Sequence, residues 1–392
     1  MKKLNISICF IFSCLILSIS CFCQGFTKVN TYTGSFKDAD RSAWYGQAVK
    51  DVYELGIMDG ISDEYFGINE QMTVSHTITV AARLHSIYNS KTITDVSNSN
   101  NWFDKYVLYC ENNGIIARNR FDDYSRPILS YEAVCMFSAA LPNDFYKKIN
   151  DVKGILDVPD NIFFAQEVLG FYNAGILCGN DDYGTFLPTE KLTRARAATI
   201  ISRICFPQKR LTFSLLPQLP EYDIDTVFNI FSYQTKQNTL DKIKLITIDG
   251  IEISGAMYRY YSYIGNGSSK KILEKAKEYA GIVQMTKDEG LKITRTQLCA
   301  MLSSYYNAKT AQYSSGTFDN VLEGNRLSDE AFAKISVANA LVPLLRTHIG
   351  ASITQDDEKS VDSAYTSKLK ALINSFDISY ASNFENLAAV ID

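Results

Sequence analysis

The sequence predicts a mostly α-helical protein whose two halves differ in organisation. One pattern occurs three times before residue 207: an aromatic residue, a valine five residues later and a Gly-Ile pair twelve residues later. The aromatic residues are Trp44, Trp102 and Phe163, so the copies repeat at intervals of 58 and 61 residues. Such fixed spacing indicates one supersecondary unit used three times in tandem. After residue 240 this pattern stops, and long amphipathic segments with two short strand-like segments predict a second, helical domain.

The start of the chain has the order of a secretory signal peptide. A lysine pair is followed by an apolar run from Ile6 to Ile19 and then by small and cysteine residues. We assign residues 1–24 to this segment, with cleavage between Ser20 and Gly25. Ser20-Cys21 is also faintly similar to a lipoprotein cleavage site. No later stretch reaches the roughly 18 apolar residues of a membrane span. We therefore expect a secreted protein, located at the cell wall or cell surface.

Each repeat is predicted to fold as helix, loop, helix, over residues 31–90, 91–148 and 149–207. In the third copy an apolar helical face is followed by Gly175, which suits a left-handed helix stop. A loop rich in glycine and aspartate comes next. Thr193 is then a suitable N-cap for the second helix, whose apolar stripe contains Ala197, Ile200 and Ile204.

The third copy resembles the surface-layer homology (SLH) domain. The resemblance is carried by an Asp-Val pair, a GI-x-x-G turn, an F-x-P segment and a helix that opens Leu-Thr-Arg-Ala-Arg. In this chain these are Asp157-Val158, residues 175–179, residues 186–188 and residues 192–196, with Arg203 at the helix end. Copies 1 and 2 match the first half of the pattern well and the second half poorly. The resemblance covers about residues 31–207 and implies three SLH repeats in a pseudo-threefold bundle.

The resemblance also implies a ligand. SLH domains are wall anchors that bind secondary cell-wall polysaccharide non-covalently, and that polymer often carries a pyruvate ketal. Arginine suits such a carboxylate because its guanidinium donates two parallel, charge-assisted hydrogen bonds. Arg194 and Arg196 stand in a first helical turn, where a positive charge costs about 0.3–1 kcal/mol against the helix dipole. We therefore expect an anion near them, the alternative being an ion pair with Asp157, Asp181 or Asp182.

The other copies depart from this pattern, because Val74 and Ser130 stand where the third copy has Arg194. Either the ligand is held mainly at one groove, or the polymer differs from the pyruvylated type. Arg126 could replace the missing arginine in the second copy. The tryptophans could stack on sugar rings, although core or groove-wall positions are more usual at such places. The predicted polysaccharide-binding residues are Arg194, Arg196, Asp157, Gly179, Trp44, Trp102 and Arg126.

Composition excludes several other functions. A net charge of −4 and a pI near 5.6 give no broad basic surface for nucleic acid. The three histidines have no metal-ligand spacing, and we find neither a G-x-S-x-G motif nor a glycine-rich phosphate loop. We therefore expect no catalytic residues, no metal, no cofactor and no enzyme activity. The five cysteines after the leader are expected to be buried free thiols.

The second half is predicted to begin with a linker, residues 208–239, which contains Pro217 and Pro220. The domain at 240–392 should open with a strand at 245–248 and a turn at Asp249-Gly250. Several amphipathic helices should follow, and a second strand at 376–380 should pair with the first. The sequence thus predicts a helical domain with a small two-stranded element.

This second domain resembles the N-terminal chaperone domain of the SurA-like extracytoplasmic peptidyl-prolyl isomerases, with no parvulin domain. The matching segments are residues 248–254, 289–294, 318–322 and 327–332. A decayed fourth SLH repeat around residues 293–297 and an unrelated helical domain are the alternatives. The resemblance implies a module that holds exported polypeptides or packs as a spacer. The competing expectations are a structural or assembly protein of a surface layer or envelope complex, with protein–protein contacts from tyrosines 258, 260 and 261, and a wall-anchored enzyme.

Overall fold

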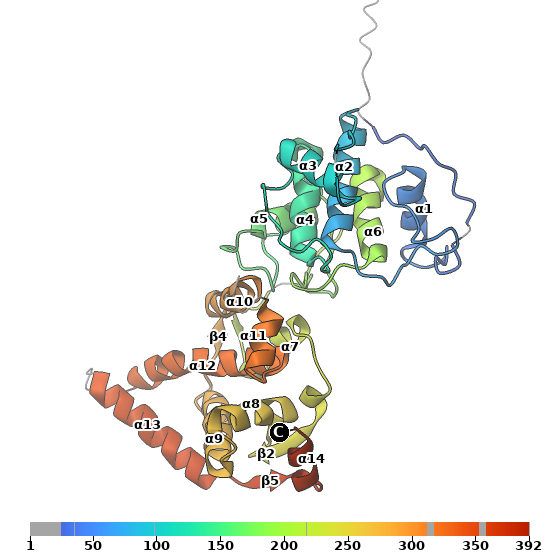
Figure 1. Ribbon diagram of the computed structural model, residues 1–392. Helices are drawn as coiled ribbons and strands as arrows, with labels where there is room; N and C mark the ends of the chain where they lie inside the picture. The colour runs from blue at the N-terminus through green and yellow to red at the C-terminus, as the bar shows by residue number, and fades with distance from the viewer. Residues whose placement is uncertain are drawn as a thin grey trace, which may run out of the picture.

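The computed structural model describes residues 25–34, 36–97, 99–216, 218–311, 317–352 and 358–391. Within these ranges the chain is mostly helical, with 14 α-helices and small antiparallel sheets, which confirms the predicted fold class (Figure 1). The predicted signal peptide lies outside the described residues. None of the described helices is both long enough and apolar enough to cross a lipid bilayer.

The N-terminal half consists of helix–loop–helix units, called hairpins here, whose helices pack mainly on those of the neighbouring units. Their helices are α1 (Gly46–Glu54) with α2 (Val74–Tyr88), α3 (Asp104–Asn112) with α4 (Ser130–Ala139), and α5 (Ala165–Asn173) with α6 (Arg194–Cys205). The first helix of each hairpin packs on the second helix of the hairpin before it: α3 on α2, α5 on α4, and α1 back on α6. The packing therefore closes a circle of hairpins, with the first in contact with the third.

A ring of backbone hydrogen bonds joins the segments that precede α2, α4 and α6. Met72 N donates to Leu192 O at 2.8 Å, Leu192 N donates to Ile128 O at 3.1 Å, and Ile128 N donates to Met72 O at 2.8 Å. Each residue thus donates to one neighbour and accepts from the other. All three side chains are buried, so the ring lies in the core where an unpaired backbone group would be costly. This ring gives the hairpins their approximate threefold arrangement.

The C-terminal half combines helices with small sheets. Strand β1 (Glu221–Tyr222) pairs with β4 (Ile293–Thr294), and a second sheet has the order β3 (Ile251–Ser254), β2 (Lys244–Ile248), β5 (Ile378–Tyr380). Pairing of Ile246 with Tyr380 and of Ile248 with Ile378 confirms the predicted contact between the first and last strands. The predicted two-stranded element was too small, because β3 also pairs with β2.

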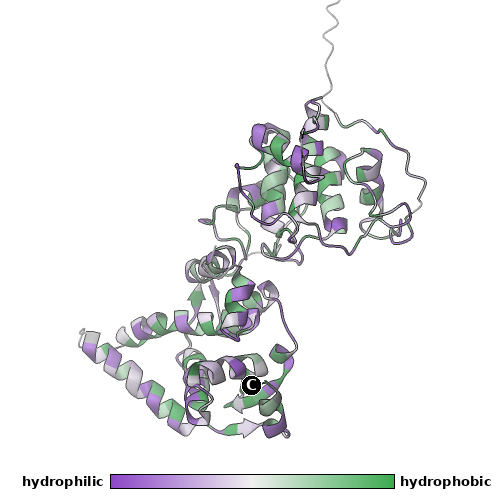
Figure 2. Ribbon diagram, in the orientation of Figure 1, coloured by the Kyte–Doolittle hydropathy of each residue, from purple (hydrophilic) through white to green (hydrophobic). Residues whose placement is uncertain are grey.

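The helices of this half are amphipathic, and hydrophobic and hydrophilic stretches alternate along α12 and α13 (Figure 2). A short 3-10 turn occurs in this half at Leu240–Lys242, and two others lie earlier in the chain, at Asn143–Phe145 and at Pro207–Lys209. The α-helices are α7 (Ile224–Gln234), α8 (Gly255–Gly265), α9 (Ser269–Asp288), α10 (Arg295–Thr310), α11 (Phe318–Gly324), α12 (Asp329–Gly350), α13 (Glu358–Ser375) and α14 (Phe384–Ile391).

The segment expected to be a linker contains regular structure. Both β1 and α7 fall within residues 208–239, and α7 packs against α9 and α12. The reason is an apolar face on α7, where Val227 and Phe231 are almost completely buried. The prolines that suggested a linker lie before this helix, so they delimit it without interrupting it.

The two halves are in direct contact through the loop before α5. Tyr306 of α10 donates its hydroxyl hydrogen to the backbone oxygen of Asp157 at 2.8 Å, and Gln234 Nε2 at the end of α7 donates to Asp157 Oδ2 at 2.9 Å. Tyr306 and Asp157 are fully buried, and the Tyr306 and Phe164 ring centroids are 6.3 Å apart. The C-terminal half therefore packs on the third hairpin.

Candidate functional site

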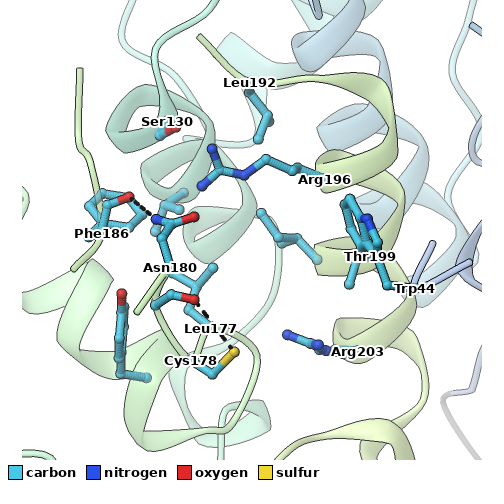
Figure 3. A pocket seen from close by; sticks show the side chains of 14 residues that line it. Trp44, Ser130, Leu177, Cys178, Asn180, Phe186, Leu192, Arg196, Thr199 and Arg203 are labelled. Carbon is cyan, nitrogen blue, oxygen red and sulfur yellow. Dashed lines mark hydrogen bonds between the residues drawn. The ribbon is translucent and has the colours of Figure 1, made fainter. Parts of the chain in front are cut away.

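A cavity of about 250 Å³ lies where all the hairpins of the N-terminal half meet (Figure 3). Helix α6 and the turn after α5 form two of its walls, Ser130 at the start of α4 closes another side, and Trp44 stands at the edge of α6. The cavity brings together three of the residues predicted from the sequence: Trp44, Gly179 and Arg196.

Two arginines of α6 give the cavity its positive charge. The side chains of Arg196 and Arg203 both extend toward the turn at residues 177–180, from opposite ends of the cavity (Figure 3). Arg196 forms an ion pair with Glu190. An ion pair within the protein was the alternative to a bound ligand, but the carboxylates expected for it were Asp157, Asp181 and Asp182. Arg203 donates from Nη1 to the backbone oxygen of Ile176 at 2.9 Å.

The turn that lines the cavity depends on glycine. Gly175 has a φ of +71° and Gly179 a φ of +87°, both in the left-handed region. A Cβ at Gly179 would lie 2.3 Å from the Cα of Gly184, so a larger residue would push the loop apart. Gly179 therefore shapes the cavity through its backbone, which is a different role from ligand contact by a side chain.

The aromatic residue of each repeat lies at the surface; of the two positions expected for the tryptophans, core or groove wall, Trp44 has the second. The exposed fractions are 65% for Trp44, 57% for Trp102 and 58% for Phe163. Each ring lies beside the second helix of the preceding hairpin: Trp102 packs on His76 of α2 and Phe163 on Tyr131 of α4, with centroids 5.4 and 5.5 Å apart. Trp44 lines the cavity, so its ring combines an open face with a hollow beside it.

Arg194 lies outside this cavity, although it is only two residues from Arg196. Its side chain is buried and donates from Nε to Phe66 O at 2.8 Å and from Nη2 to Asp59 O. The guanidinium carbon is also 4.7 Å from the centroid of the Phe66 ring. Burial lowers the pKa of Arg194 despite the nearby charges of Asp59 and Asp38. Arg194 thus holds the loop of the first hairpin through two of its donors.

The remaining predicted residues also have internal partners. Arg126 is hydrogen-bonded twice to Glu132, at 2.7 and 2.9 Å, so it does not stand open for a ligand. Asp157 is completely buried at the contact between the halves and accepts the backbone N–H groups of Phe186 and Leu187 at 2.8 and 2.7 Å. Burial raises its pKa to about 6, because these hydrogen bonds only partly offset the loss of hydration.

Several residues around the cavity were missed as site residues: Ser130, Cys178, Asn180, Thr199 and Arg203. Ser130 and Arg203 both stood in the compared repeat positions, so the alignment of the copies was the signal that could have found them. Among the described residues no cluster of three or more histidine, cysteine or carboxylate side chains could hold a metal ion. All five cysteines described are free, but only Cys110 and Cys205 are buried, so the expectation of buried thiols was too broad.

Comparison with known families gives one match of direct relevance. Residues 35–73 match the S-layer homology domain. This segment contains α1, its following loop and the segment that enters the backbone ring. An S-layer homology domain implies a cell-surface protein that is anchored to the cell wall, and it suggests binding of cell-wall polysaccharide.

The rest of the chain is not characterised by these comparisons. They give no evidence for three repeats of the domain or for a SurA-like region, and the expected chaperone role is not supported. No curated protein matches the chain.

Proposed function

We propose that this protein is a secreted wall-binding protein, held non-covalently to secondary cell-wall polysaccharide by three S-layer homology hairpins and acting without catalysis. The match at residues 35–73 supports the identity of the first hairpin. The closed ring of hydrogen bonds through Met72, Ile128 and Leu192 supports treating the second and third hairpins as the same kind of unit. The main contact site is the cavity beside Trp44.

The observation that carries this proposal is the combination of Trp44 with two arginines around one hollow. An aromatic ring with an exposed face offers a flat apolar surface to a sugar ring. Arg196 and Arg203 supply positive charge and hydrogen-bond donors to acidic groups on the same polymer. At about 250 Å³ the cavity is smaller than the roughly 300–1,000 Å³ of drug-sized sites, which suits a terminal or branching sugar.

For the C-terminal half we propose a spacer that packs on the anchor. Its support is the buried contact of Tyr306 and Gln234 with Asp157, which fixes one end of this half against the third hairpin. Tyr258 and Tyr261 are buried, so the tyrosine surface that an assembly role would have used is not available. We therefore do not carry the assembly role forward as a second candidate.

The test is binding of the secreted chain, residues 25–392, to cell walls that retain or lack secondary polysaccharide. We expect co-sedimentation only with walls that retain the polymer. Trp44→Ala should weaken this binding about tenfold, which corresponds to about 1.4 kcal/mol. Trp102→Ala is the matched control, because Trp102 is similarly exposed but its ring packs against His76 of α2 and does not line the cavity. Equal losses for the two variants, or equal binding to stripped walls, would contradict the proposal.

A further inference from the structure

One arginine in the C-terminal half of α2 and one in that of α6 occupy corresponding places. Arg83 and Arg203 each stand nine residues after the first residue of their helix. Each donates from Nη1 to the isoleucine carbonyl in the turn of its own hairpin: Arg83 to Ile57 at 3.2 Å and Arg203 to Ile176 at 2.9 Å. The two guanidinium groups therefore occupy the same position of the repeat.

Their surroundings differ by one carboxylate. In the first hairpin Asp59 follows two residues after Ile57, and its Oδ2 is 2.9 Å from Arg83 Nη1. In the third hairpin the residue at that place is Cys178, which has no carboxylate to offer. Among the residues that the structure describes, no ion pair involves Arg203, whereas Arg196 across the cavity is paired with Glu190. Arg203 is thus a partly buried cation without a carboxylate partner.

We propose that Arg203 is the residue of the cavity that recognises a carboxylate on the wall polymer, and that Cys178 determines this by leaving the place of Asp59 open. The inference rests on the proposed function, to which it adds the charged group that is recognised and the residue that selects the groove. A guanidinium has five N–H donors in a planar fork, and the contact to Ile176 uses one of them. A carboxylate entering beside Cys178 would accept from the remaining donors, at the place where Asp59 Oδ2 meets Arg83 in the first hairpin.

The same comparison explains why the grooves should differ in affinity. Around the turn of the first hairpin, Asp59 already neutralises Arg83, and the neighbouring Arg194 is bonded to backbone oxygens. Around the turn of the third hairpin, Ser130 stands at the position of Arg194, and it lines an open cavity. An anionic sugar therefore finds an unneutralised arginine beside a hollow in one groove and a completed ion pair in the other.

The experiment compares the full secreted chain with Arg203→Gln, Cys178→Asp and Cys178→Ser. Equilibrium binding is measured to purified secondary wall polysaccharide and to the same polymer after carbodiimide and borohydride reduction of its carboxylates. Arg203→Gln and Cys178→Asp should each weaken binding to the native polymer by about 10- to 100-fold, the usual worth of a charged hydrogen bond. Cys178→Ser places no charge beside Arg203, so its loss of binding should be smaller than that of Cys178→Asp.

The reduced polymer identifies the anion. Wild type and Arg203→Gln should bind it equally weakly, because the carboxylate that distinguishes them is gone. A loss for Arg203→Gln that persists on the reduced polymer would point to a phosphate or a neutral contact, and would overturn the inference. Mild acid treatment, which cleaves ketals, then separates a ketal-linked pyruvate from a uronic acid as the source of the carboxylate.

The outcomes separate this inference from the proposed function. If the wild type binds no polysaccharide, the proposed function fails. If the wild type binds and Trp44→Ala weakens binding, but Arg203→Gln and Cys178→Asp do not, the proposed function stands and this inference is wrong. Thermal unfolding checks that each variant is folded. Cys178→Asp retains Arg203, so it decides the question even if Arg203→Gln fails to fold.

Discussion

Arg194 illustrates how a residue chosen for ligand binding can serve the fold. Its guanidinium reaches from the third hairpin to Asp59 O and Phe66 O in the first, and it stacks on the Phe66 ring. These oxygens lie more than 100 residues earlier in the chain, so local sequence gave no sign of them. The bonds close the circle of hairpins at the level of single side chains.

We predict that Arg194→Ala lowers the free energy of unfolding by about 2–4 kcal/mol, since it leaves two inward-facing backbone oxygens without their donor. Arg194→Lys should restore only part of the loss, because an ammonium cannot span both acceptors and stack on Phe66. Urea unfolding of residues 25–392 measures both. Arg196→Ala is the control and should cost less than about 1 kcal/mol, because its pair with Glu190 is partly exposed. Equal stabilities of Arg194→Ala and the wild type would contradict this role.

At the scale of elements, one buried carboxylate of α1 bonds to α6 and to the turn that follows α6. Asp51 of α1 accepts a hydrogen bond from the Ser202 hydroxyl of α6 and forms an ion pair with Lys209 in the turn after α6. Asp51 is only 3% exposed, whereas the Lys209 side chain is about one-third exposed. The contact explains why α1, the first of the described helices, packs on α6, the last α-helix of the N-terminal half.

Asp51→Asn should therefore lower the free energy of unfolding by about 1–3 kcal/mol, since it removes the charge from a buried hydrogen-bonded pair. A double-mutant cycle with Lys209→Met isolates the ion pair, and we expect a coupling energy of about 0.5–2 kcal/mol. Lys50→Met, on the same helix at the surface, is the control. Additive effects of the Asp51 and Lys209 changes would show that the pair does not hold α1 in place.

Elements with strong local signals could be predicted from the sequence. Thr193 caps α6 as expected, because its side chain accepts the N–H of Arg196, and Gly175 has the left-handed φ of a helix stop. The pairing of the first and last strands of the C-terminal half was also predictable from the need to pair exposed backbone. Helix α7 was missed because the nearby prolines were given more weight than the apolar spacing from Ile224 to Phe231.

The candidate site was predicted only in part, for a geometrical reason. Arg194 and Arg196 were expected to serve one ligand, but residues two positions apart lie about 200° apart around an α-helix. They therefore face different grooves, one against the first hairpin and one into the cavity. Arg203 was not predicted because its place depends on a contact between α6 and the turn after α5, at the backbone oxygen of Ile176, that spacing alone does not reveal.

At the scale of the whole molecule, two aspartates at corresponding positions of the first and third hairpins have different environments. Asp38 in the first hairpin and Asp157 in the third each accept the backbone N–H groups of the loop that follows the first helix. Desolvation acts to raise the pKa of Asp38, but hydrogen bonds from Phe66, Gly67 and Ile68 outweigh it and the pKa is lowered. Asp157 is covered by α7 and α10 as well, and its pKa is raised to about 6.

This difference predicts a pH-dependent stability that originates at the contact between the halves. A folded-state pKa of about 6 against an ordinary value of 3.8 means that the folded protein binds the proton more tightly than the unfolded chain. The stabilisation from Asp157 is therefore complete below about pH 4 and is lost as the pH rises through about 6, by about 3 kcal/mol in total.

Asp157→Asn cannot titrate, so the wild type should gain stability relative to this variant between pH 7 and pH 4.5. Chemical unfolding at the two pH values measures the difference, with Asp38→Asn as control. Because the pKa of Asp38 is lowered, its stabilisation is lost only below pH 4, and the offset between wild type and Asp38→Asn should stay constant over the same range. A constant offset for Asp157→Asn as well would mean that the C-terminal half does not bury this carboxylate in solution.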